Sequence, residues 1–524
     1  MPTSVQKITN AFVHHWQIIT IAFAGLLVRL YQLTSISLWH DEAFSALLIK
    51  YSWSEMIYRI GLDVHPPMYY IFLRIWHYVF GNSLFSLRGM SVFFGVATII
   101  AAYFFVKHVF NNAQAAVIAA LLVAFNPFLV QYVTEARMYT MGSFFAIVAA
   151  YYLAIALRNQ KQVYTEHAHL NWKLQRLYVR PYIIFAVASA ILILTHYYLL
   201  FTVAALALYA IWYHLKSYGF TFKYYGWLIA SGALIALSFL PWLKIFLFQY
   251  KQVGNGYWIP PMDSWSIPNT LFEMIVKIGN PSKYELLLVT LATVWIISRV
   301  IKKYSNNEKW LLISLFIAPF AGAILFYVLA QLNDQSSSVY LVRYFIFTSA
   351  FYAIIIALYL HTFTTKHIRN VLVIVLCGMH LYAIGYYWNQ IDVATKPGMA
   401  ALSAFTNANV EPNHKLYVGS SFQFFNFKYY NKSGVTPLLF SGGQSDTSNM
   451  PHFAGTAILT NEDLVPDFNK ATISGDTVWV IWTNGFGGAQ PLVPDNWTRI
   501  DEKRFAEVRP YVGTFVTVTQ YKVN

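Results

Sequence analysis

The sequence predicts a mainly α-helical, polytopic membrane protein that ends in a small soluble α/β domain. Of its 524 residues, 57% are hydrophobic and only 11% are charged, and the mean hydropathy is +0.47. Soluble domains carry about 25% charged residues. Apolar runs close to the roughly 20 residues that cross a bilayer recur up to residue 388 and then stop. We therefore expect a membrane domain at 1–391 and an extracytoplasmic α/β domain at 392–524.

About eleven transmembrane helices are expected in the membrane domain. The sequence Thr-His-Tyr-Tyr at Thr195–Tyr198 interrupts one long apolar stretch and divides it into two short spans. The expected spans are 16–35, 86–108, 113–132, 138–157, 181–196, 199–215, 225–247, 284–301, 309–330, 341–362 and 368–388.

The distribution of Lys and Arg predicts the orientation of these spans in the cell membrane. The basic loops at 158–180, 302–309 and 363–369 fall on one side if the N-terminus is cytoplasmic. The loop at 36–85 and the tail then lie outside the cytoplasm. Nine of the eleven carboxylates in the first 391 residues fall on that outer side. Acids gathered at one face of an apolar protein indicate a reaction centre.

The net charge of +14 is uneven along the chain. Residues 1–391 hold 26 Lys and Arg against 11 Asp and Glu, whereas residues 392–524 hold 10 against 11. No helix-turn-helix or zinc-finger pattern accompanies the basic charge, which argues against nucleic acid as a partner. Phosphate groups of membrane lipids are the expected partners of the basic membrane domain.

Both soluble parts of the chain show regular patterns. In the outer loop, Ser45–Ile60 and Met68–Phe80 have helical apolar spacing, and we expect two helices along the membrane surface, the second started by Pro66-Pro67. The tail is expected to fold as a helix, three strands and a Gly/Ser/Asp loop. These are Lys396–Asn409, then Lys415–Val418, Thr477–Trp482 and Gly513–Val523, and Ser441–Ser448.

Acidic residues in the outer loop are the first candidates for catalysis. Asp41 and Glu42 directly follow the first span, so one carboxylate is able to act as general base while the other orients it or binds a metal. The alternative is a helix cap, because Asp is favoured at helix N-termini. Asp63 and His65, in Asp-Val-His-Pro-Pro, add a second carboxylate and an imidazole. Their alternative is a capped turn before a helix.

Further candidates lie in the other outer turns. Glu135, Arg137 and Tyr139 form a Glu-Ala-Arg-Met-Tyr turn, in which Arg137 either holds phosphate or pairs with Glu135. Arg343-Tyr344 opens the tenth span and has the same two interpretations. His196 lies in the turn between two spans. It is either a substrate contact or a structural residue, and a lone histidine is more often structural.

In their order along the chain, these motifs resemble those of the GT-C glycosyltransferases. Asp-Glu after the first span, His-Pro-Pro, Glu-Ala-Arg-Met-Tyr, Thr-His-Tyr and Arg-Tyr are most similar to the family 39 group. That group includes the protein O-mannosyltransferases and their bacterial relatives, and the aminoarabinose transferases of lipid A are more distant. The resemblance covers the membrane domain. It implies that Asp41 is the catalytic base, that Glu42 and Asp63 are the accompanying acids and that Arg137 is the turn arginine.

Two departures limit what the resemblance implies about the acceptor. The chain lacks the Trp-Trp-Asp motif of the oligosaccharyltransferase branch. It also lacks an obvious β-trefoil domain like that of the eukaryotic mannosyltransferases. A protein acceptor therefore does not follow, and glycan, lipid and protein acceptors stay open.

The expected topology leads to the same chemistry. Sugar nucleotides are cytoplasmic, so an outward-facing enzyme needs a donor such as a polyprenyl-phosphate sugar. Transfer then requires a base for the acceptor proton, cations for the leaving phosphate and a groove for the prenyl chain. Asp41 fits the first role, and Arg137 and Arg343 fit the second. A single displacement inverts the anomeric centre. A divalent metal at Asp41, Glu42 or His196 stays an open alternative, since no ligand spacing demands one.

A polytopic transporter of sugars or lipid-linked sugars is the main rival hypothesis. Transporters usually place their charged residues near the middle of the membrane, often on paired broken helices. Here the acids cluster in an outer loop, and no half-repeat is evident. A non-catalytic membrane scaffold is the second rival, and it leaves the outer acids unexplained. The sequence therefore favours a transferase.

Overall fold

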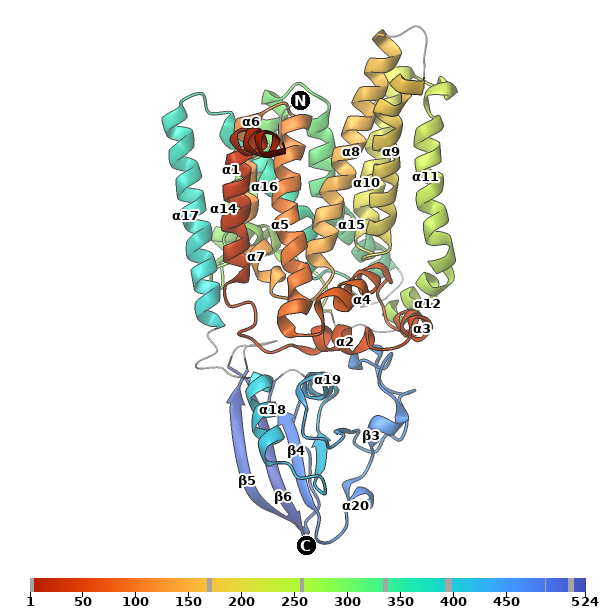
Figure 1. Ribbon diagram of the computed structural model, residues 1–524, viewed down its shortest axis with the longest axis vertical. Helices are drawn as coiled ribbons and strands as arrows, with labels where there is room; N and C mark the ends of the chain where they lie inside the picture. The colour runs from red at the N-terminus through yellow and green to blue at the C-terminus, as the bar shows by residue number, and fades with distance from the viewer. Residues whose placement is uncertain are drawn as a thin grey trace. The chain divides into compact units, whose positions relative to one another are not determined.

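The computed structural model describes residues 4–166, 172–254, 259–332, 338–391, 398–485, 487–507 and 513–524 (Figure 1). The chain divides into two compact units. The helical unit comprises residues 1–31, 65–69 and 89–386, and the α/β unit comprises residues 32–64, 70–88 and 387–524. The α/β unit thus includes most of the first outer loop together with the tail. The predicted domain boundary between 391 and 392 stays a prediction.

The helical unit is built from long apolar helices, which confirms the predicted fold class. Nine helices in the described part of the chain are long and apolar enough to cross a membrane, or ten if the bent pair α6 and α7 counts as one span. The apolar segment His15–Leu30 of α1 is shorter. The helices are α1 (Ser4–Leu30), α5 (Leu84–Val109), α6 (Ala113–Phe125), α7 (Pro127–Val133), α8 (Tyr139–Glu166), α9 (Trp172–Ile193), α10 (Leu199–Tyr218), α11 (Gly226–Phe239), α12 (Leu243–Gly254), α13 (Ser266–Ile275), α14 (Lys283–Lys303), α15 (Glu308–Leu332), α16 (Ile346–His361) and α17 (Lys366–Gln390).

Local sequence explains the breaks between these helices. Between α6 and α7 the axis bends by 51°. Asn126 caps α7 there by accepting a hydrogen bond of 2.9 Å from the Leu129 N–H, and Pro127 occupies the first helical position. The predicted break at Thr195–Tyr198 is confirmed, because α9 ends at Ile193 and α10 begins at Leu199.

Exposure of large apolar side chains identifies the surface that faces lipid. Leu237 of α11 is 65% exposed, Leu288 of α14 is 67% exposed and Ile374 of α17 is 69% exposed. By contrast, α16 is buried along most of its length. A soluble protein rarely exposes such contiguous apolar surface, whereas lipid chains cover it without cost.

The loop at 36–85, most of which belongs to the α/β unit, forms three helices. They are α2 (His40–Leu48), α3 (Trp53–Leu62) and α4 (Met68–Phe80), of which α4 begins in the helical unit. The prediction of one helix at Ser45–Ile60 was therefore wrong. Ser52 Oγ accepts a hydrogen bond of 3.3 Å from the Glu55 N–H and starts α3 anew. The prediction of Met68–Phe80 agrees with α4.

The tail forms a six-stranded mixed sheet with strand order β3-β2-β1-β4-β6-β5. β3, β2, β1 and β4 are parallel to one another, and β6 is antiparallel to both of its neighbours, β4 and β5. The helix and strands predicted at Lys396–Asn409, Lys415–Val418, Thr477–Trp482 and Gly513–Val523 are present within two residues, although Lys396 itself lies outside the described residues. The elements are α18 (Gly398–Asn409), β1 (Lys415–Val418), α19 (Ser421–Tyr430), β2 (Leu438–Phe440), β3 (Leu464–Val465), α20 (Phe468–Ala471), β4 (Thr477–Thr483), β5 (Trp497–Ala506) and β6 (Phe515–Val523).

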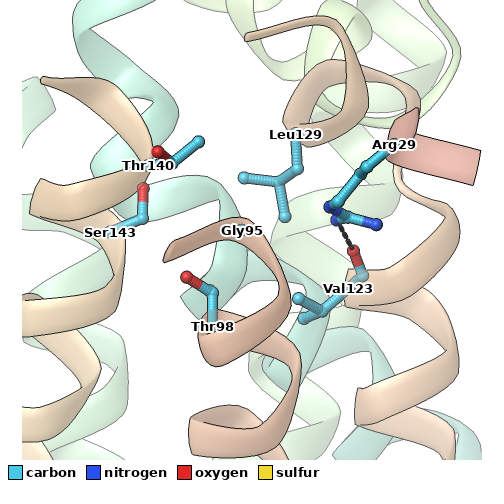
Figure 2. Close-up of a pocket in the computed structure, with 7 residues that line it drawn as sticks. All are labelled: Arg29, Gly95, Thr98, Val123, Leu129, Thr140 and Ser143. Carbon is cyan, nitrogen blue, oxygen red and sulfur yellow. Dashed lines mark hydrogen bonds between the residues drawn. The ribbon is translucent and has the colours of Figure 1, made fainter. Parts of the chain in front are cut away.

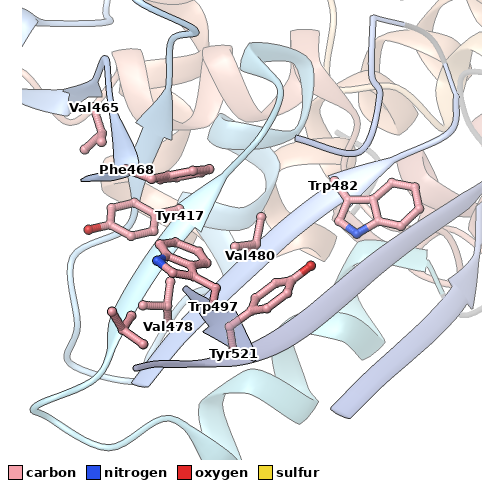
Figure 3. Close-up of a cluster of buried hydrophobic side chains, with 9 residues drawn as sticks. Tyr417, Val465, Phe468, Val478, Val480, Trp482, Trp497 and Tyr521 are labelled. Atoms are coloured by element: carbon pink, nitrogen blue, oxygen red, sulfur yellow. The ribbon is translucent and has the colours of Figure 1, made fainter. Parts of the chain in front are cut away.

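Side chains on the two faces of this sheet form separate cores. On one face, Trp497 packs on Phe468 of α20 and on Tyr521, with 5.0 and 5.5 Å between ring centroids, and Trp482 belongs to the same buried cluster (Figure 3). On the other face, Trp479 of β4 packs against Phe405 of α18, with 6.1 Å between the ring centroids. The continuous apolar run of β4 is therefore explained by burial on both faces. The exposed edge strand β5 is instead rich in charge, which protects it from pairing with other chains.

Candidate active site

The turn between α7 and α8 carries the Glu-Ala-Arg-Met-Tyr motif. It is buried, because Glu135 is 5% exposed and Arg137 is 3% exposed. Ser91 Oγ of α5 donates a hydrogen bond of 2.6 Å to the Glu135 carbonyl oxygen. The N–H of Arg137 donates to the same oxygen over 2.9 Å. These bonds hold the backbone of the turn against α5 and so fix the position from which Arg137 extends.

His65 lies beside the guanidinium of Arg137. The distance between Arg137 Nη2 and His65 Nε2 is 3.3 Å. Gln249 of α12 donates a hydrogen bond of 3.4 Å from Nε2 to the His65 carbonyl oxygen. The N–H of Met68 donates to the carbonyl oxygen of Leu194 over 2.8 Å. The His-Pro-Pro segment is therefore tied both to α12 and to the turn after α9.

His196 lies in this turn and is neutral. The N–H of Tyr198 donates to His196 Nδ1 over 3.1 Å, so Nδ1 accepts and the ring proton resides on Nε2. Burial first, and then the neighbouring His65, Arg137 and Arg343 side chains, hold the pKa of His196 well below its usual value. The imidazole is therefore a neutral donor through its Nε2–H.

Aromatic contacts connect His196 to the remaining predicted residues of the helical unit. Its ring centroid lies 4.7 Å from that of Tyr344, 5.9 Å from that of His65 and 6.5 Å from that of Tyr139. Arg343 and Tyr344 belong to a 3-10 turn, η3 (Val342–Phe345), that leads into α16. The structure thus brings together one group of predicted residues, named here the cationic cluster: His65, Glu135, Arg137, Tyr139, His196, Arg343 and Tyr344.

An apolar groove of about 860 Å³ lies between α10 and α15 of the same unit. It is lined by large apolar and aromatic side chains and by small residues of α15. Phe201, near the start of α10, lines the groove and packs on Tyr198 with 5.4 Å between ring centroids. Tyr198 in turn lies 5.4 Å from Tyr344 of the cationic cluster. The groove therefore adjoins the cationic cluster through two aromatic contacts.

The predicted acids Asp41, Glu42 and Asp63 belong to the α/β unit. Glu42 is 0% exposed and forms a bidentate ion pair, in which Arg88 Nε donates to Oε1 and Nη2 donates to Oε2, each over 2.8 Å. Arg88 Nη1 also donates to the carbonyl oxygens of Leu33 and Ile36, over 2.8 and 2.9 Å. Both oxygens of Glu42 are thus engaged in fixing the start of α2. A catalytic role for Glu42 stays a prediction.

Asp41 and Asp63 are both half-buried. Asp41 lies near the N-terminus of α2, whereas Asp63 lies at the C-terminus of α3. Asp41 lies in the first turn of α2, where the helix dipole favours a carboxylate. The ring of the preceding His40 packs against Phe422 and Phe425 of α19, with centroid distances of 5.0 and 5.4 Å. Asp63 ends α3. The sheet domain therefore anchors the helix that presents Asp41.

Two contributors to these sites were missed by the sequence reasoning. Arg88 lies inside the expected span 86–108. A charged residue within a membrane span usually has a buried partner, so its position was a signal. Gln249 gave no such signal. Its Oε1 accepts a hydrogen bond from the hydroxyl of Tyr197, which itself accepts one of 2.9 Å from Trp242 Nε1.

A metal ion at Asp41, Glu42 or His196 stays a prediction. Among the described residues, no three or more His, Cys, Asp or Glu side chains gather in a way that could hold a metal ion. Glu42, one of the residues considered as a ligand, has both oxygens bonded to Arg88.

Comparisons with known proteins agree with this architecture. Residues 64–243 match the family model described as dolichyl-phosphate-mannose-protein mannosyltransferase. The crystal structure of ArnT from Cupriavidus metallidurans bound to undecaprenyl phosphate is similar over 96% of this chain and 98% of that chain, with a TM-score of 0.62 and 11% identity. The chain has the GT-C fold. Its resemblance to GT-C proteins, predicted from the motifs, is confirmed.

The apo structure of the same ArnT is also similar, over 90% of this chain and 93% of that chain, with a TM-score of 0.61 and 12% identity. No curated protein is significantly similar in sequence. The family match includes His65, Arg137 and His196, whereas Asp41 and Arg343 lie outside it. Most of the cationic cluster therefore lies in the part of the chain that matches the family.

Proposed function

We propose that the protein is a membrane glycosyltransferase that moves a sugar from a polyprenyl-phosphate donor to an extracytoplasmic acceptor. The observation that carries this proposal is the cationic cluster beside an apolar groove. A polyprenyl-phosphate sugar has a charged phosphate attached to a long apolar chain, and the two features of the helical unit match those two parts. The similarity in fold to a protein solved with undecaprenyl phosphate supports the same class of donor.

The cationic cluster has the chemistry needed to hold the donor phosphate. Arg137 and Arg343 supply guanidinium groups, which bind phosphate oxygens through charge-assisted hydrogen bonds. His196 adds a neutral Nε2–H donor and needs no proton from solvent to do so. As the bond from sugar to phosphate breaks, negative charge grows on the phosphate. Fixed donors and cations at that place stabilise the transition state more than the bound donor.

The groove between α10 and α15 fits the prenyl chain. Its wall is almost wholly apolar, and its helices are apolar enough to cross a membrane. Phe201 and Tyr198 lie between the groove and Tyr344, so a lipid in the groove would place its head toward the cluster. The chain would be held by apolar burial and the head by charge, which together define the orientation of the donor.

Asp41 is the proposed proton acceptor. Its half-buried carboxylate lies in the first turn of α2, while the neighbouring Glu42 is held by Arg88 and positions that turn. In the reaction, the acceptor hydroxyl loses its proton to Asp41 and its oxygen bonds to the anomeric carbon. The bond from that carbon to the phosphate oxygen breaks, and the electron pair leaves with the phosphate. One such displacement inverts the anomeric centre.

The test is turnover of a defined donor. Purified protein in liposomes is supplied with undecaprenyl phosphate carrying labelled mannose or other single sugars, and with cell-envelope extract as the acceptor source. We expect release of undecaprenyl phosphate together with labelled product. Movement of intact labelled donor across the bilayer, without cleavage, would instead support the transporter hypothesis.

Blocking the groove tests the donor site independently of the acceptor. Ala321 lines the groove, and Ala321→Trp would fill part of it. Ala292 is exposed on α14, outside the groove, so Ala292→Trp is the matched control. We expect only Ala321→Trp to weaken binding of undecaprenyl phosphate. Equal binding by both variants would place the prenyl chain elsewhere.

The proposed outer location of the α/β unit is tested by labelling with a membrane-impermeant thiol reagent. Cys377 is first replaced by Ser, and single cysteines are then introduced at Ser448 and at Lys302, both exposed. We expect labelling of intact cells at position 448 and, at position 302, only after permeabilisation. The reverse pattern would remove the argument for a lipid-linked donor.

A further inference from the structure

The apolar groove between α10 and α15 has a limited length. On α10 its lining residues run from Phe201 to Trp212, and on α15 they run from Trp310 to Leu325. At about 1.5 Å of rise per residue, these stretches correspond to about 16 and about 22 Å. Both are shorter than the hydrocarbon core of a bilayer, which is roughly 30 Å thick. The groove therefore covers only part of the depth of the membrane.

One end of the groove adjoins the cationic cluster. Phe201 at this end packs on Tyr198, which lies beside Tyr344 of the cluster. The Phe201 ring also reaches across to α15, because a Cβ on Gly322 would lie only 2.5 Å from three of its atoms. Small residues line this half of the groove and leave room for a chain. They are Ala204, Ala205, Ala318, Ala321 and Gly322.

The opposite end carries residues that are typical of a membrane interface. Trp212 and Trp310 line it. The ammonium groups of Lys216 and Lys309 lie over these two indole rings, 5.1 and 5.4 Å from the ring centroids. Trp is enriched where hydrocarbon meets the polar headgroups, and Lys extends toward the same level. A chain that follows the groove would therefore meet headgroups and water if it continued straight past this end.

The groove is open to lipid along its side. Leu208 of α10 is 67% exposed and Leu325 of α15 is 56% exposed, although both line the groove. A chain can therefore leave it sideways into the bilayer. Because lipid tails are as apolar as the groove wall, moving a chain from lipid into the groove gives no hydrophobic gain. Close packing against the wall is what remains to favour binding.

A second pocket of the helical unit is too small for a lipid chain (Figure 2). Its volume is about 10 Å³, against about 860 Å³ for the groove. Arg29, which lines this pocket, donates hydrogen bonds to the carbonyl oxygens of Ala124 and Val123, over 2.7 and 3.1 Å. Its guanidinium thus joins α1 to α6. Of these two pockets, the groove is the one with room for a chain.

We propose that the protein recognises its lipid donor by the isoprene units next to the phosphate, about four of them, and leaves the remaining units in the bilayer. Each unit adds four carbon atoms to the length of the chain, so roughly three to four extended units match the shorter wall of about 16 Å. Units beyond the groove contact lipid whether the donor is bound or free, so they add nothing to the affinity. This inference rests on the proposed function, which supplies the identity of the occupant.

Competition in nanodiscs tests how much of the chain is recognised. Labelled undecaprenyl phosphate is displaced by unlabelled polyprenyl phosphates of two, three, four, six and eleven isoprene units, each supplied as a mole fraction of the bilayer. We expect an affinity gain of about tenfold from two to four units, and of less than about twofold from four to eleven.

Two outcomes of this competition overturn the inference and leave the proposed donor class intact. One is a steady gain in affinity up to eleven units, and the other is equal affinity at two and eleven units. If no lipid displaces the label, unlabelled undecaprenyl phosphate included, the proposed function fails as well.

A variant that shortens the groove gives the second test. Leu208 lies about 10 Å along α10 from Phe201. Because its side chain is exposed to lipid, Leu208→Trp should fold normally while filling the groove beyond the first two isoprene units. Leu237→Trp, at a similarly exposed position of α11 outside the groove, is the matched control.

We expect Leu208→Trp to keep its affinity for the two-unit lipid and to lose most of the roughly tenfold gain between two and four units. Leu237→Trp should keep the whole gain. An equal loss of affinity at two and four units in Leu208→Trp, or no change at either length, contradicts the inference.

Discussion

The buried arginines of the two compact units lie in different surroundings. In the α/β unit, Arg88 is paired with the carboxylate of Glu42 through two bonds of 2.8 Å, so the pair is neutral as a whole. In the helical unit, Arg137 lies beside His65 within the cationic cluster, which also holds the carboxylate of Glu135. The first arrangement fixes the start of α2. We propose that the second arrangement holds the donor phosphate.

The largest expected effect is on turnover, and it separates Asp41 from the paired Glu42. Asp41→Asn should lower the rate on the order of 10²–10⁴-fold while donor binding persists, because the amide keeps the shape but accepts no proton. Release of undecaprenyl phosphate from a labelled donor in liposomes measures this. Asp495→Asn, an exposed substitution in the same unit, is the control. Asn also caps helices well, so a fully active Asp41→Asn protein would leave Asp41 only a capping role.

Next in size is the loss of stability when the buried pair is broken. Arg88→Met leaves the Glu42 carboxylate buried without its partner and should cost about 3–5 kcal/mol. The double variant Arg88→Met with Glu42→Leu should lose less, because no charge is left unpaired. Thermal unfolding in detergent measures both. Glu55→Gln breaks the more exposed pair with Arg59 and should cost about 0.3–0.5 kcal/mol. A double variant less stable than Arg88→Met would refute this account.

The cationic cluster should affect donor binding more than stability. Arg137→Ala and Arg343→Ala each remove a charge-assisted hydrogen bond to phosphate, worth roughly 1.5–3 kcal/mol, or about tenfold to a hundredfold in affinity. Binding of undecaprenyl phosphate to the protein in nanodiscs measures this. Arg299→Ala, an exposed change on α14, is the control. If both cluster variants bind like the control, the phosphate lies elsewhere.

The smallest predicted effect concerns Glu507, a buried acid that accepts hydrogen bonds from neutral side chains. Glu507 accepts hydrogen bonds from Gln423 Nε2 and Thr483 Oγ1, over 3.2 and 2.9 Å, and burial raises its pKa from 4.5 to about 7. The folded state therefore keeps a proton that the unfolded state loses near pH 4.5. Stability from this group is full below pH 4.5 and falls by roughly 1–3 kcal/mol as the pH rises to about 7.

Hydrogen exchange of peptides from β4 and α19 measures this local stability as a function of pH. Glu507→Gln should flatten the decline between pH 4.5 and 7, because the amide does not titrate. Glu462→Gln, at an exposed position of the same unit, should leave the decline intact. A decline that persists in Glu507→Gln would assign it to another group.

The sequence by itself determined the membrane class and most of the helices. Long apolar runs with few charges are stable only as membrane helices, since every backbone group must be satisfied within the segment. Local signals also located α4, β1 and β4. They did not locate α19 or β5. Aromatic residues in Ser421–Tyr430 lie on all sides of the helix and give no apolar stripe, and Trp497–Ala506 is a charged edge strand that pairs with β6.

Only the tertiary structure decided which candidates share a site. The motifs around His65, Arg137, His196 and Arg343 are separated in sequence by tens to hundreds of residues, and helix packing brings them together. Adjacent residues also acquired different roles, because a helix turns by about 100° per residue. Glu42 therefore points into the protein to meet Arg88, while Asp41 stays half-exposed. Composition and order along the chain predict a fold, whereas burial and the partner of each charge depend on distant segments.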